Sequence, residues 1–327
     1  MRVFVAGASG AIGTRLVPRL IERGHEVIGT ATSPASAERV RASGAEAVVL
    51  DLLDPAAVRR VVLESSPDAI THQATALADV RFSRRLDRTF AVTNRLRTEG
   101  TDALLAAARE AGVRRFVAQS FASFRNARTG GWVKTEDDPL DPDPLPSARG
   151  AHAAMRHLDE AVTAAGGIIL RYGAFYGADN DGLLEPVRKR QLPIVGSGDG
   201  VTSFIHLDDA AEATVLALEH DGAGIFNVVD DDPAPVREWL PVLADALGAK
   251  PPRHVPGWLA RLVAGDLAVM MGTEARGASN AKARRELGWA PRHASWREGF
   301  PIAYVSAADR PTRRGGATSI EATPRRA

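Results

Sequence analysis

The chain has 327 residues, 45% of them hydrophobic, and a formal net charge of +1. A chain of this size can bury a large core, as one α/β unit with an appended lobe or as two domains. The absence of cysteine excludes disulfides and cysteine-based metal sites or nucleophiles, and no basic face indicates nucleic-acid binding, so we expect neither a metal nor a nucleic-acid partner. No apolar run approaches the roughly 20 residues that cross a bilayer and the chain enters a strand without a basic leader, so we expect a cytoplasmic protein without membrane attachment.

The first thirteen residues predict a buried strand at 3–5, a glycine-rich turn, and a helix from 11 to about 23. Gly7 permits the turn, Gly10 lets the backbone approach a bulky anion, and Gly13 lets the helix pack closely on the strand. The first helical turn then offers N–H groups and the positive end of its dipole to a pyrophosphate. The expected dinucleotide contacts here are Gly7, Ser9, Gly10, Ala11, Ile12 and Gly13. For this turn alone, glycines that serve only packing remain the alternative.

The next segments alternate between strand and helix. We expect strands at 26–30, 47–50, 68–72 and 115–119, and helices at 35–43, 54–65 and about 87–111. This alternation predicts an α/β fold with a Rossmann-type, doubly wound parallel sheet, in which ligands lie beyond the carboxyl ends of the strands. We expect the dinucleotide-binding domain to cover 1–172, with return elements at about 201–230. A smaller C-terminal substrate lobe would combine 173–200 with 231–305.

Small or polar residues follow three of these strands. Past the second strand, hydroxyl groups stand where a carboxylate would mark NAD, which favours NADP although the usual arginine is missing and NAD remains possible. Asp51, after the third strand, is placed to accept the adenine amino group, and Asp54 is the better cap for the following helix. The expected cofactor contacts at these strand ends are Thr30, Thr32, Ser33, Asp51, Leu52, Gln73, Ala74 and Thr75.

Several motifs occur in the order typical of the extended short-chain dehydrogenase/reductases. They are the glycines at 7, 10 and 13, Asp51-Leu52, Gly100-Thr101, and the segments 136–142, 170–177, 204–210 and 286–291. On these motifs the chain resembles the NAD-dependent epimerases and dehydratases of that group over about residues 1–300. The resemblance implies a bound nicotinamide dinucleotide, a small-molecule substrate under a closing lobe, and backbone at Tyr172 and Gly173 beside the nicotinamide ring.

The resemblance also implies a tyrosine four residues before a lysine, for proton transfer. Aligning Glu160 with the family puts His152 at the tyrosine position and Arg156 at the lysine position. Residues four apart share one helix face, and an imidazole titrates near neutrality without help from a cation. His152 with Arg156 is therefore a candidate catalytic pair. The alternative is that His152 is an ordinary polar residue on a solvated or dimer-facing helix.

Other side chains compete for roles at the reaction site. Phe121 falls where the family has a hydroxyl, flanked by the candidate catalytic residues Ser120 and Ser123, and Arg97 stands in place of an asparagine. The long polar loop at about 122–148 adds Lys134 and Glu136. Three further residues are more readily structural: His72 after its strand, Tyr176 as core packing, and His206 before a helix that Asp208 and Asp209 would cap.

The C-terminal part predicts a strand at 224–229, a helix at 236–247 and an apolar helix at 257–271 that would line a pocket for a partly apolar substrate. The segment 306–327 has too little apolar content to fold and is expected to be disordered. Apolar positions on the helices at 87–111 and 149–165, among them Met155, Leu158 and Val162, exceed what one sheet would cover. By resemblance these helices pair across a two-fold axis, which predicts a homodimer.

Three functions are compatible with these patterns. The leading one is an NADP(H)-dependent oxidoreductase or epimerase/dehydratase-like enzyme that acts on a hydroxyl or carbonyl carbon of a small, partly apolar or sugar-like substrate. A second is a non-redox lyase or cyclase on the same scaffold. A third is a dinucleotide-sensing protein without catalysis, which would not need the tyrosine and lysine that are missing here.

Overall fold

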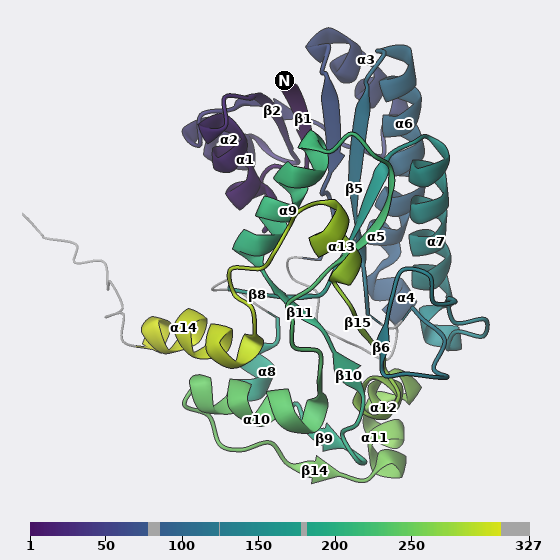
Figure 1. Cartoon of the computed structure of the whole chain (residues 1–327), viewed down its shortest axis with the longest axis vertical. Coiled ribbons are helices and arrows are strands. Elements are labelled where there is room, and N and C mark those ends of the chain that lie inside the picture. The colour runs from purple at the N-terminus through teal and green to yellow at the C-terminus, as the bar shows by residue number, and fades with distance from the viewer. Residues whose placement is uncertain (78–85, 124, 178–181, 309–327) are drawn as a thin grey trace, which may run out of the picture.

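The computed structural model describes residues 1–77, 86–123, 125–177 and 182–308. Its centre is a sheet of seven strands in the order β12-β7-β5-β4-β1-β2-β3, and all neighbours run parallel (Figure 1). The strands are β1 (Arg2–Ala6), β2 (Glu26–Ala31), β3 (Glu46–Val49), β4 (Ala69–His72), β5 (Arg115–Phe121), β7 (Ile168–Tyr172) and β12 (Gly224–Val228). The chain moves outward from β1 to β3 and then returns to β4, so the predicted doubly wound sheet is confirmed. Its switch point lies between β1 and β4.

Helices cover both faces of this sheet (Figure 1). Alternate residues of β1 show why: Val3 and Val5 pack with one set of helices, and Phe4 and Ala6 with the other. The first set is α1 (Gly13–Glu22), α2 (Pro34–Ala42), α9 (Leu207–Glu219) and α13 (Ala281–Glu286); the second is α3 (Pro55–Ser65), α6 (Thr101–Glu110) and α7 (Arg149–Ala164). Strands buried on both faces explain the continuous apolar runs in the sequence.

Two helices that the sequence predicts as continuous are interrupted. The segment expected at 87–111 divides into α4 (Leu86–Thr89), α5 (Ala91–Arg95), a π-helical turn η1 (Leu96–Gly100), and α6. The apolar segment at 257–271 divides into α11 (Gly257–Ala264) and α12 (Asp266–Thr273), because Gly265 adopts a φ of 85° that ends the first helix. Both breaks lie close to the candidate site.

A smaller lobe lies below the sheet in Figure 1, and its role in substrate binding stays a prediction. Its small parallel pairs join β8 (Ala174–Tyr176) with β11 (Phe204–His206), β9 (Ile194–Val195) with β14 (His254–Val255), and β6 (Val133–Lys134) with β15 (Gly277–Ala278); β10 (Val201–Thr202) and β13 (Ala234–Pro235) pair antiparallel. The remaining helices are α8 (Leu184–Arg188), α10 (Val236–Ala246), α14 (Trp296–Ala308) and a short 3₁₀ turn, η2 (Pro146–Ala148).

Aromatic side chains form the core of this lobe. Phe204 makes edge-on contacts with Trp239 and Phe300, and Tyr176 packs edge-on against Phe300. Tyr176 is 1% exposed, which confirms its predicted packing role. Because α14 continues to Ala308, the prediction of disorder from Ser306 is wrong for three residues, and the rest of that segment lies outside the described residues.

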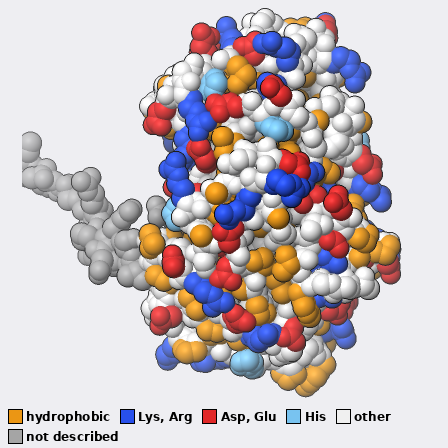
Figure 2. Space-filling view, viewed as in Figure 1, with side chains coloured by type: hydrophobic (Ala, Val, Ile, Leu, Met, Phe, Trp, Pro, Cys, Tyr) orange, Lys and Arg blue, Asp and Glu red, His pale blue; other side chains and the backbone are white. Residues whose placement is uncertain are grey.

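The visible face in Figure 2 mixes acidic and basic side chains over the sheet domain, and hydrophobic side chains gather over the lobe. Trp258 and Leu262 of α11 are 69% and 68% exposed. Within the described part of the chain, no helix has both the length and the apolar character needed to span a membrane.

Candidate functional site

The glycine turn between β1 and α1 is built for close approach of backbone. Gly7 has a φ of +91°, and a Cβ on it would lie 2.8 Å from the backbone of Ala74. A Cβ on Gly13 would lie 2.4 Å from the carbonyl oxygen of Gly7, whereas Gly10 is exposed and would meet that oxygen only at 3.2 Å. Gly7 and Gly13 are therefore required by packing, and Gly10 leaves the outer side of the turn open.

The N-terminus of α1 differs from those of the next two helices. Ser33 caps α2 with its hydroxyl and Asp54 caps α3 with its carboxylate, as predicted for Asp54. No side chain caps α1, and its first turn holds no acidic residue. The amides of Thr14 and Arg15 already donate to the carbonyl oxygens of Gly10 and Ile12, so the amides of residues 11–13, directly before them, are the ones left for an anion. Ala11 is exposed, Ser9 is half-buried and Ile12 is buried. The turn fits the pyrophosphate of a dinucleotide.

The three hydroxyls at the carboxyl end of β2 have different surroundings. The Thr30 hydroxyl is buried and accepts a hydrogen bond from the Gly7 amide at 3.0 Å, so it secures the glycine turn. The Ser33 hydroxyl is engaged in the cap of α2 with Ser36. Thr32 is exposed. The prediction that all three receive a 2′-phosphate is therefore corrected: two are occupied by backbone or cap contacts, and Thr32 is the available hydroxyl.

The other strand ends also hold predicted contacts. Asp51 is exposed and accepts a hydrogen bond from the Leu53 amide, and Leu52 beside it is buried. Gln73 is buried, donates to the Thr71 hydroxyl, and keeps its Oε1 without a partner among the described residues. Ala74 and Thr75 follow it, both half-buried, where Ala74 closes over the glycine turn.

The side chain of Tyr172 belongs to the core. Its hydroxyl contacts the Thr214 hydroxyl at 2.6 Å, and burial raises its pKa well above the usual range. Gly173 is needed for packing, because a Cβ there would lie 2.6 Å from the carbonyl oxygen of Ser203. Any contact of this segment with a cofactor must therefore come from backbone.

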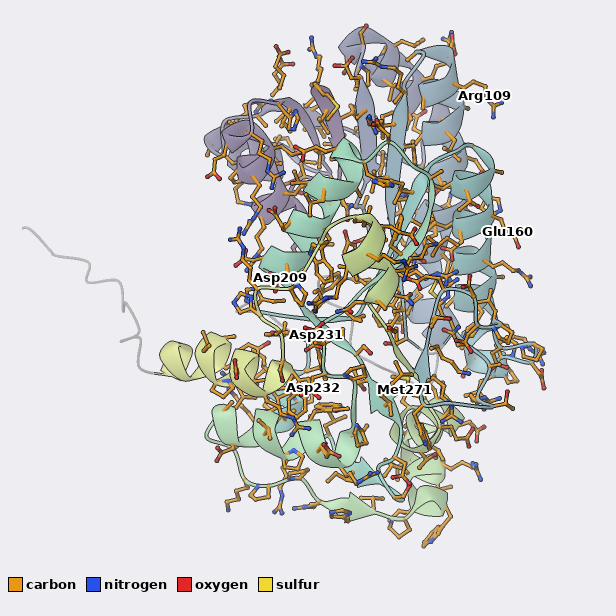
Figure 3. All side chains as sticks on the ribbon, viewed as in Figure 1. Arg109, Glu160, Asp209, Asp231, Asp232 and Met271 are labelled. Atoms are coloured by element: carbon orange, nitrogen blue, oxygen red, sulfur yellow. The ribbon has the colours of Figure 1, made fainter. Side chains whose placement is uncertain are left out.

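The residues of α7 that face the sheet are each one position earlier in the sequence than expected. Asp159, not Glu160, is the buried acid: it pairs with Arg125 at 2.5 Å and Arg171 at 2.8 Å, while Glu160 points outward in Figure 3. Moving the alignment by one residue places Ala151 and Met155 at the tyrosine and lysine positions. Both are buried, at 0% and 1% exposure.

The two members of the expected pair, His152 and Arg156, lie in different surroundings. Arg156 is exposed and lines an outer groove between α5 and α7, so it cannot serve as the cation behind the reaction site. His152 is half-buried, beside the inward face. The apolar positions Leu158 and Val162 pack on the chain's own sheet, and Met155 packs within its own chain too, so none is a surplus surface for a partner. The 3.6-residue spacing of apolar side chains on α7 could have identified this face.

An apolar wall replaces the proton-transfer groups that the resemblance implies. Met155 packs with Phe121, the residue at the hydroxyl position, and with Met270 of α12. Leu145, Leu267, Met271 and Ala275 complete this cluster, and Figure 3 places Met271 between the sheet domain and the lobe. That residues 257–271 line a substrate pocket stays a prediction, and the sequence did not place Met155 in this cluster. Met155 and Met270 are 1% and 7% exposed, and Phe121 and Met271 are half-buried members of the cluster. Flexible, polarisable methionines pack well against an aromatic ring.

Both candidate serines are buried beneath this wall. The Ser120 hydroxyl accepts a hydrogen bond from Arg125 at 3.1 Å, and Arg125 also donates to the Phe121 carbonyl. Ser123 is 4% exposed. Lys134 and Glu136 are similarly engaged, since Lys134 bonds Thr129 and Asp138 while Glu136 accepts from the Asn227 amide. These contacts stabilise the loop and leave none of these four groups as an evident acid or base.

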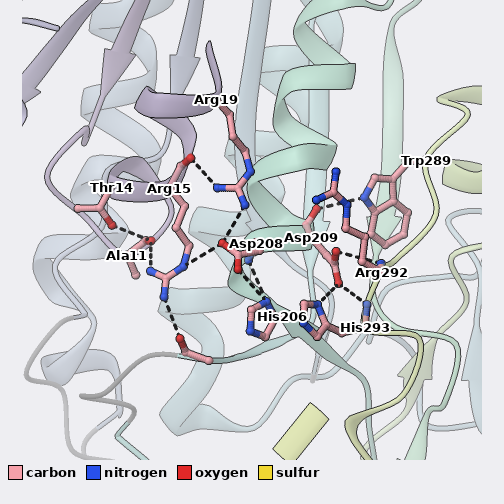
Figure 4. A network of polar contacts seen from close by, with 11 residues as sticks. Ala11, Thr14, Arg15, Arg19, His206, Asp208, Asp209, Trp289, Arg292 and His293 are labelled. Carbon is pink, nitrogen blue, oxygen red and sulfur yellow. Dashed lines mark hydrogen bonds and ion pairs between the residues drawn. The ribbon is translucent and has the colours of Figure 1, made fainter. Parts of the chain in front are cut away.

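A polar network ties α1 to α9 next to the glycine turn (Figure 4). Arg15 donates to the carbonyl oxygens of Ala11 and Gly177, and both Arg15 and Arg19 pair with Asp208. The cap of α9 is His206 rather than the predicted aspartates, because its ring nitrogen accepts from the Asp208 amide. This network holds the outer side of α1 in place.

One group of side chains in Figure 4 has the composition of a metal site: His206, Asp209 and His293, whose ligand atoms lie within 4.8 Å of one another. The Asp209 carboxylate, however, already accepts from the Arg292 amide and from the amide and ring of His293. The two imidazoles stack at 3.8 Å. We interpret the group as the joint between α9 and the 290–295 segment.

Comparison with known proteins places these features in a family context. Residues 3–228 match the model of the NAD dependent epimerase/dehydratase family. The chain is 44% identical over 311 residues to a 3-diazoavenalumate denitrifying reductase of a Streptomyces species, and the match covers 92% of this chain and 99% of that protein.

Solved structures agree on the fold. A UDP-glucose 4-epimerase from Thermotoga maritima, determined with UDP-glucose, superposes with a TM-score of 0.75 at 20% identity and covers 94% of this chain and 99% of its own. A UDP-glucose 4-epimerase from Thermus thermophilus, in complex with NAD, superposes with a TM-score of 0.71 at 26% identity, covering 94% and 98%.

Proposed function

Because the chain belongs to the NAD dependent epimerase/dehydratase family, we propose that it transfers hydride to an acceptor that needs no proton from the enzyme. It is an NAD(P)-dependent oxidoreductase or epimerase-like enzyme. The acceptor that we propose is an arenediazonium compound. The observation that carries this proposal is the apolar wall of Ala151, Met155 and Phe121 at the positions of proton transfer.

The chemistry of the acceptor decides whether a proton donor is needed. A carbonyl that receives hydride becomes an alkoxide, which must be protonated. An arenediazonium ion that receives hydride at its terminal nitrogen becomes a neutral aryl diazene, and the diazene then loses N2 and leaves an arene C–H. In the overall reaction, one hydride and one diazonium ion give one arene and one N2, and no proton is consumed.

The protein's contribution is then binding, orientation and exclusion of water. A bound reduced nicotinamide supplies the hydride. Gly10, Ala11 and the open first turn of α1 would hold the pyrophosphate, and Met155, Phe121 and Met270 would hold the aromatic ring against the carboxyl ends of β4 and β5. The name of the Streptomyces relative, a denitrifying reductase of a diazo carboxylate, supports the same substrate class.

The test uses the purified protein, NADPH or NADH, and 4-carboxybenzenediazonium labelled with ¹⁵N at the terminal nitrogen. We expect one labelled N2 and one benzoate for each dinucleotide oxidised, and no oxidation with a panel of ketones and aldehydes. Carbonyl reduction or conversion of UDP-glucose without N2 release would refute the proposal. Tight dinucleotide binding without any turnover would favour a sensor instead.

We propose NADP(H) as the preferred dinucleotide. Residues 30–33, at the carboxyl end of β2, carry no carboxylate that would repel a 2′-phosphate, and Thr32 is exposed there. The proposed cofactor contacts are those at the glycine turn, Thr32, Asp51, Leu52, Gln73, Ala74, Thr75 and the backbone of Tyr172 and Gly173. A lower KM for NADH than for NADPH would reverse the preference and leave the hydride chemistry intact.

We also propose a homodimer through the outer face of α5, η1 and α7. The groove on this face is lined by Asn94, Thr98, Ala153, Arg156 and His157, and Val92 near it is 50% exposed. Sedimentation should give a dimer at tens of micromolar, and Ala153→Glu should shift it to a monomer. A monomeric parent protein would reject this assembly.

A further inference from the structure

Arg97 is a buried cation at the candidate site for which the family resemblance supplies no role. It lies in η1, the π-helical turn, and only 7% of the residue is exposed. Its Nε has no hydrogen-bond partner among the described residues. A π turn inside an α-helix is rare and frequently marks a functional position.

The fold places this side chain between the carboxyl ends of two central strands. His72, the last residue of β4, hydrogen-bonds through its ring to the carbonyl oxygen of Leu96, directly before Arg97. Arg97 is also within electrostatic reach of Arg125 and Asp159, which meet behind the end of β5. This is the edge at which a parallel sheet binds its ligands.

Among the described residues, the charges around Arg97 do not balance. Arg97, Arg125 and Arg171 face the single carboxylate of Asp159, which Arg125 and Arg171 already occupy. Burial, with a smaller effect of Arg125, lowers the pKa of Arg97 to about 10, so the guanidinium stays charged at neutral pH. These four side chains therefore carry an excess of two positive charges, and a buried cation without a partner is costly.

We propose that Arg97 anchors an anionic oxygen of the substrate, a carboxylate or phenolate on its aromatic ring. A planar guanidinium matches such a group and discriminates strongly against neutral analogues. The inference deepens the proposed function, on which it rests for the identity of the substrate site. It predicts that an arenediazonium compound with an acidic substituent is preferred over one without.

The test measures binding of trans-cinnamate and its neutral isostere trans-cinnamamide to the dinucleotide-saturated protein. The parent should bind cinnamate at least about 10-fold more tightly, the effect of one charge-assisted hydrogen bond. Arg97→Gln should remove this preference and Arg97→Lys should keep part of it. The matched control Arg109→Gln, an exposed arginine of α6 that points into solvent in Figure 3, should leave the preference unchanged.

A parent protein that binds both probes equally would overturn the anchor, and so would a preference that survives Arg97→Gln. Loss of dinucleotide affinity alone in Arg97→Gln would also overturn it, because the residue would then serve the cofactor. If Arg97→Gln does not fold, the parent and Arg97→Lys still decide the question. Failure of N2 release with an intact preference for cinnamate would refute the diazonium reaction while leaving the anchor in place.

Discussion

The two halves of the candidate site have diverged to different degrees from the pattern that the family resemblance implies. At the glycine turn, Gly7 and Gly13 lie where any side chain would collide with backbone, and no side chain caps the N-terminus of α1. On α7 and β5, Ala151, Met155 and Phe121 stand where proton-transfer groups are expected, and they are packed into an apolar wall. On our proposal, dinucleotide binding is retained while proton delivery by the protein is not. Four substitutions test the comparison, from the largest expected effect to the smallest.

Gly10→Asp should have the largest effect: it should abolish dinucleotide binding while the protein still folds. A Cβ on the exposed Gly10 would lie 3.2 Å from the Gly7 carbonyl oxygen, a tight contact that a small shift of the turn relieves, but a carboxylate there would oppose the pyrophosphate. Like charges brought together cost several kcal/mol, so dinucleotide affinity should fall by more than about 100-fold. Fluorescence titration with NADPH and NADH measures the loss, and Gly131→Asp, in an exposed loop, is the control. Unchanged affinity in Gly10→Asp would remove the dinucleotide assignment.

Met155→Lys should damage the other half of the site. An ammonium placed in the apolar cluster, with two arginines close by on Asp159, has no partner and should lower the free energy of unfolding by about 3–5 kcal/mol. Because burial depresses the lysine pKa, this loss should shrink as the pH rises toward ~10.4, the pKa of an unfolded lysine. Met155→Leu should cost less than about 1.5 kcal/mol. A fully stable Met155→Lys protein with new carbonyl reductase activity would contradict the apolar wall.

His72 should make the free energy of unfolding decrease at acid pH. Burial lowers its pKa to about 4, although its Nε2 donates a hydrogen bond to the Leu96 carbonyl oxygen. The folded state therefore binds its proton less readily than the unfolded state, whose pKa is near 6.5. Stability is complete above pH ~6.5 and is lost as the pH falls toward 4, by up to about 3 kcal/mol. Urea unfolding of His72→Gln should show a flatter acid branch than the parent protein or the exposed-histidine control His254→Gln. An identical acid branch in all three would exclude His72.

His152→Phe should have the smallest effect. A residue that carries the proton in hydride transfer would lower turnover by roughly 10² to 10⁴ when it is removed. Because the reaction that we propose needs no such residue, we expect a change in kcat of less than about 3-fold. Steady-state kinetics with the labelled diazonium compound measure it. A loss of 10² or more would restore His152 to the mechanism.

The sequence predicted the sheet and the glycine turn because their requirements are local. A strand is read from its apolar run, and Gly7 is required by the backbone angle of its own turn. The face of α7 could not be assigned in the same way, because Asp159 and Glu160 are adjacent acids that differ only in their neighbours. Arg125 and Arg171, from distant parts of the chain, select Asp159. An error of one residue rotates the assigned helix face by about 100°. The alignment on Glu160 therefore put Arg156, rather than Met155, at the lysine position.

The breaks in the two predicted helices have a related origin. Gly265 was a visible signal for the end of α11, since glycine readily adopts the positive φ found there. The π turn at 96–100 has no comparable signal in the sequence. Its Leu96 carbonyl oxygen accepts from the Thr101 amide within the turn and also from the His72 ring of β4, a contact made only in the folded chain. The position of Arg97 at the site depended on that tertiary contact.

The central claim is that hydride transfer proceeds without a proton from the protein, and a single-turnover measurement tests it most directly. Protein loaded with reduced dinucleotide is mixed with 4-carboxybenzenediazonium between about pH 5.5 and 7.5, the range in which an ordinary histidine titrates. We predict a rate of dinucleotide oxidation that is independent of pH and equal in H2O and D2O, with N2 released in the same proportion. A rate that follows a single ionisation and slows in D2O would reveal a proton donor and contradict the account.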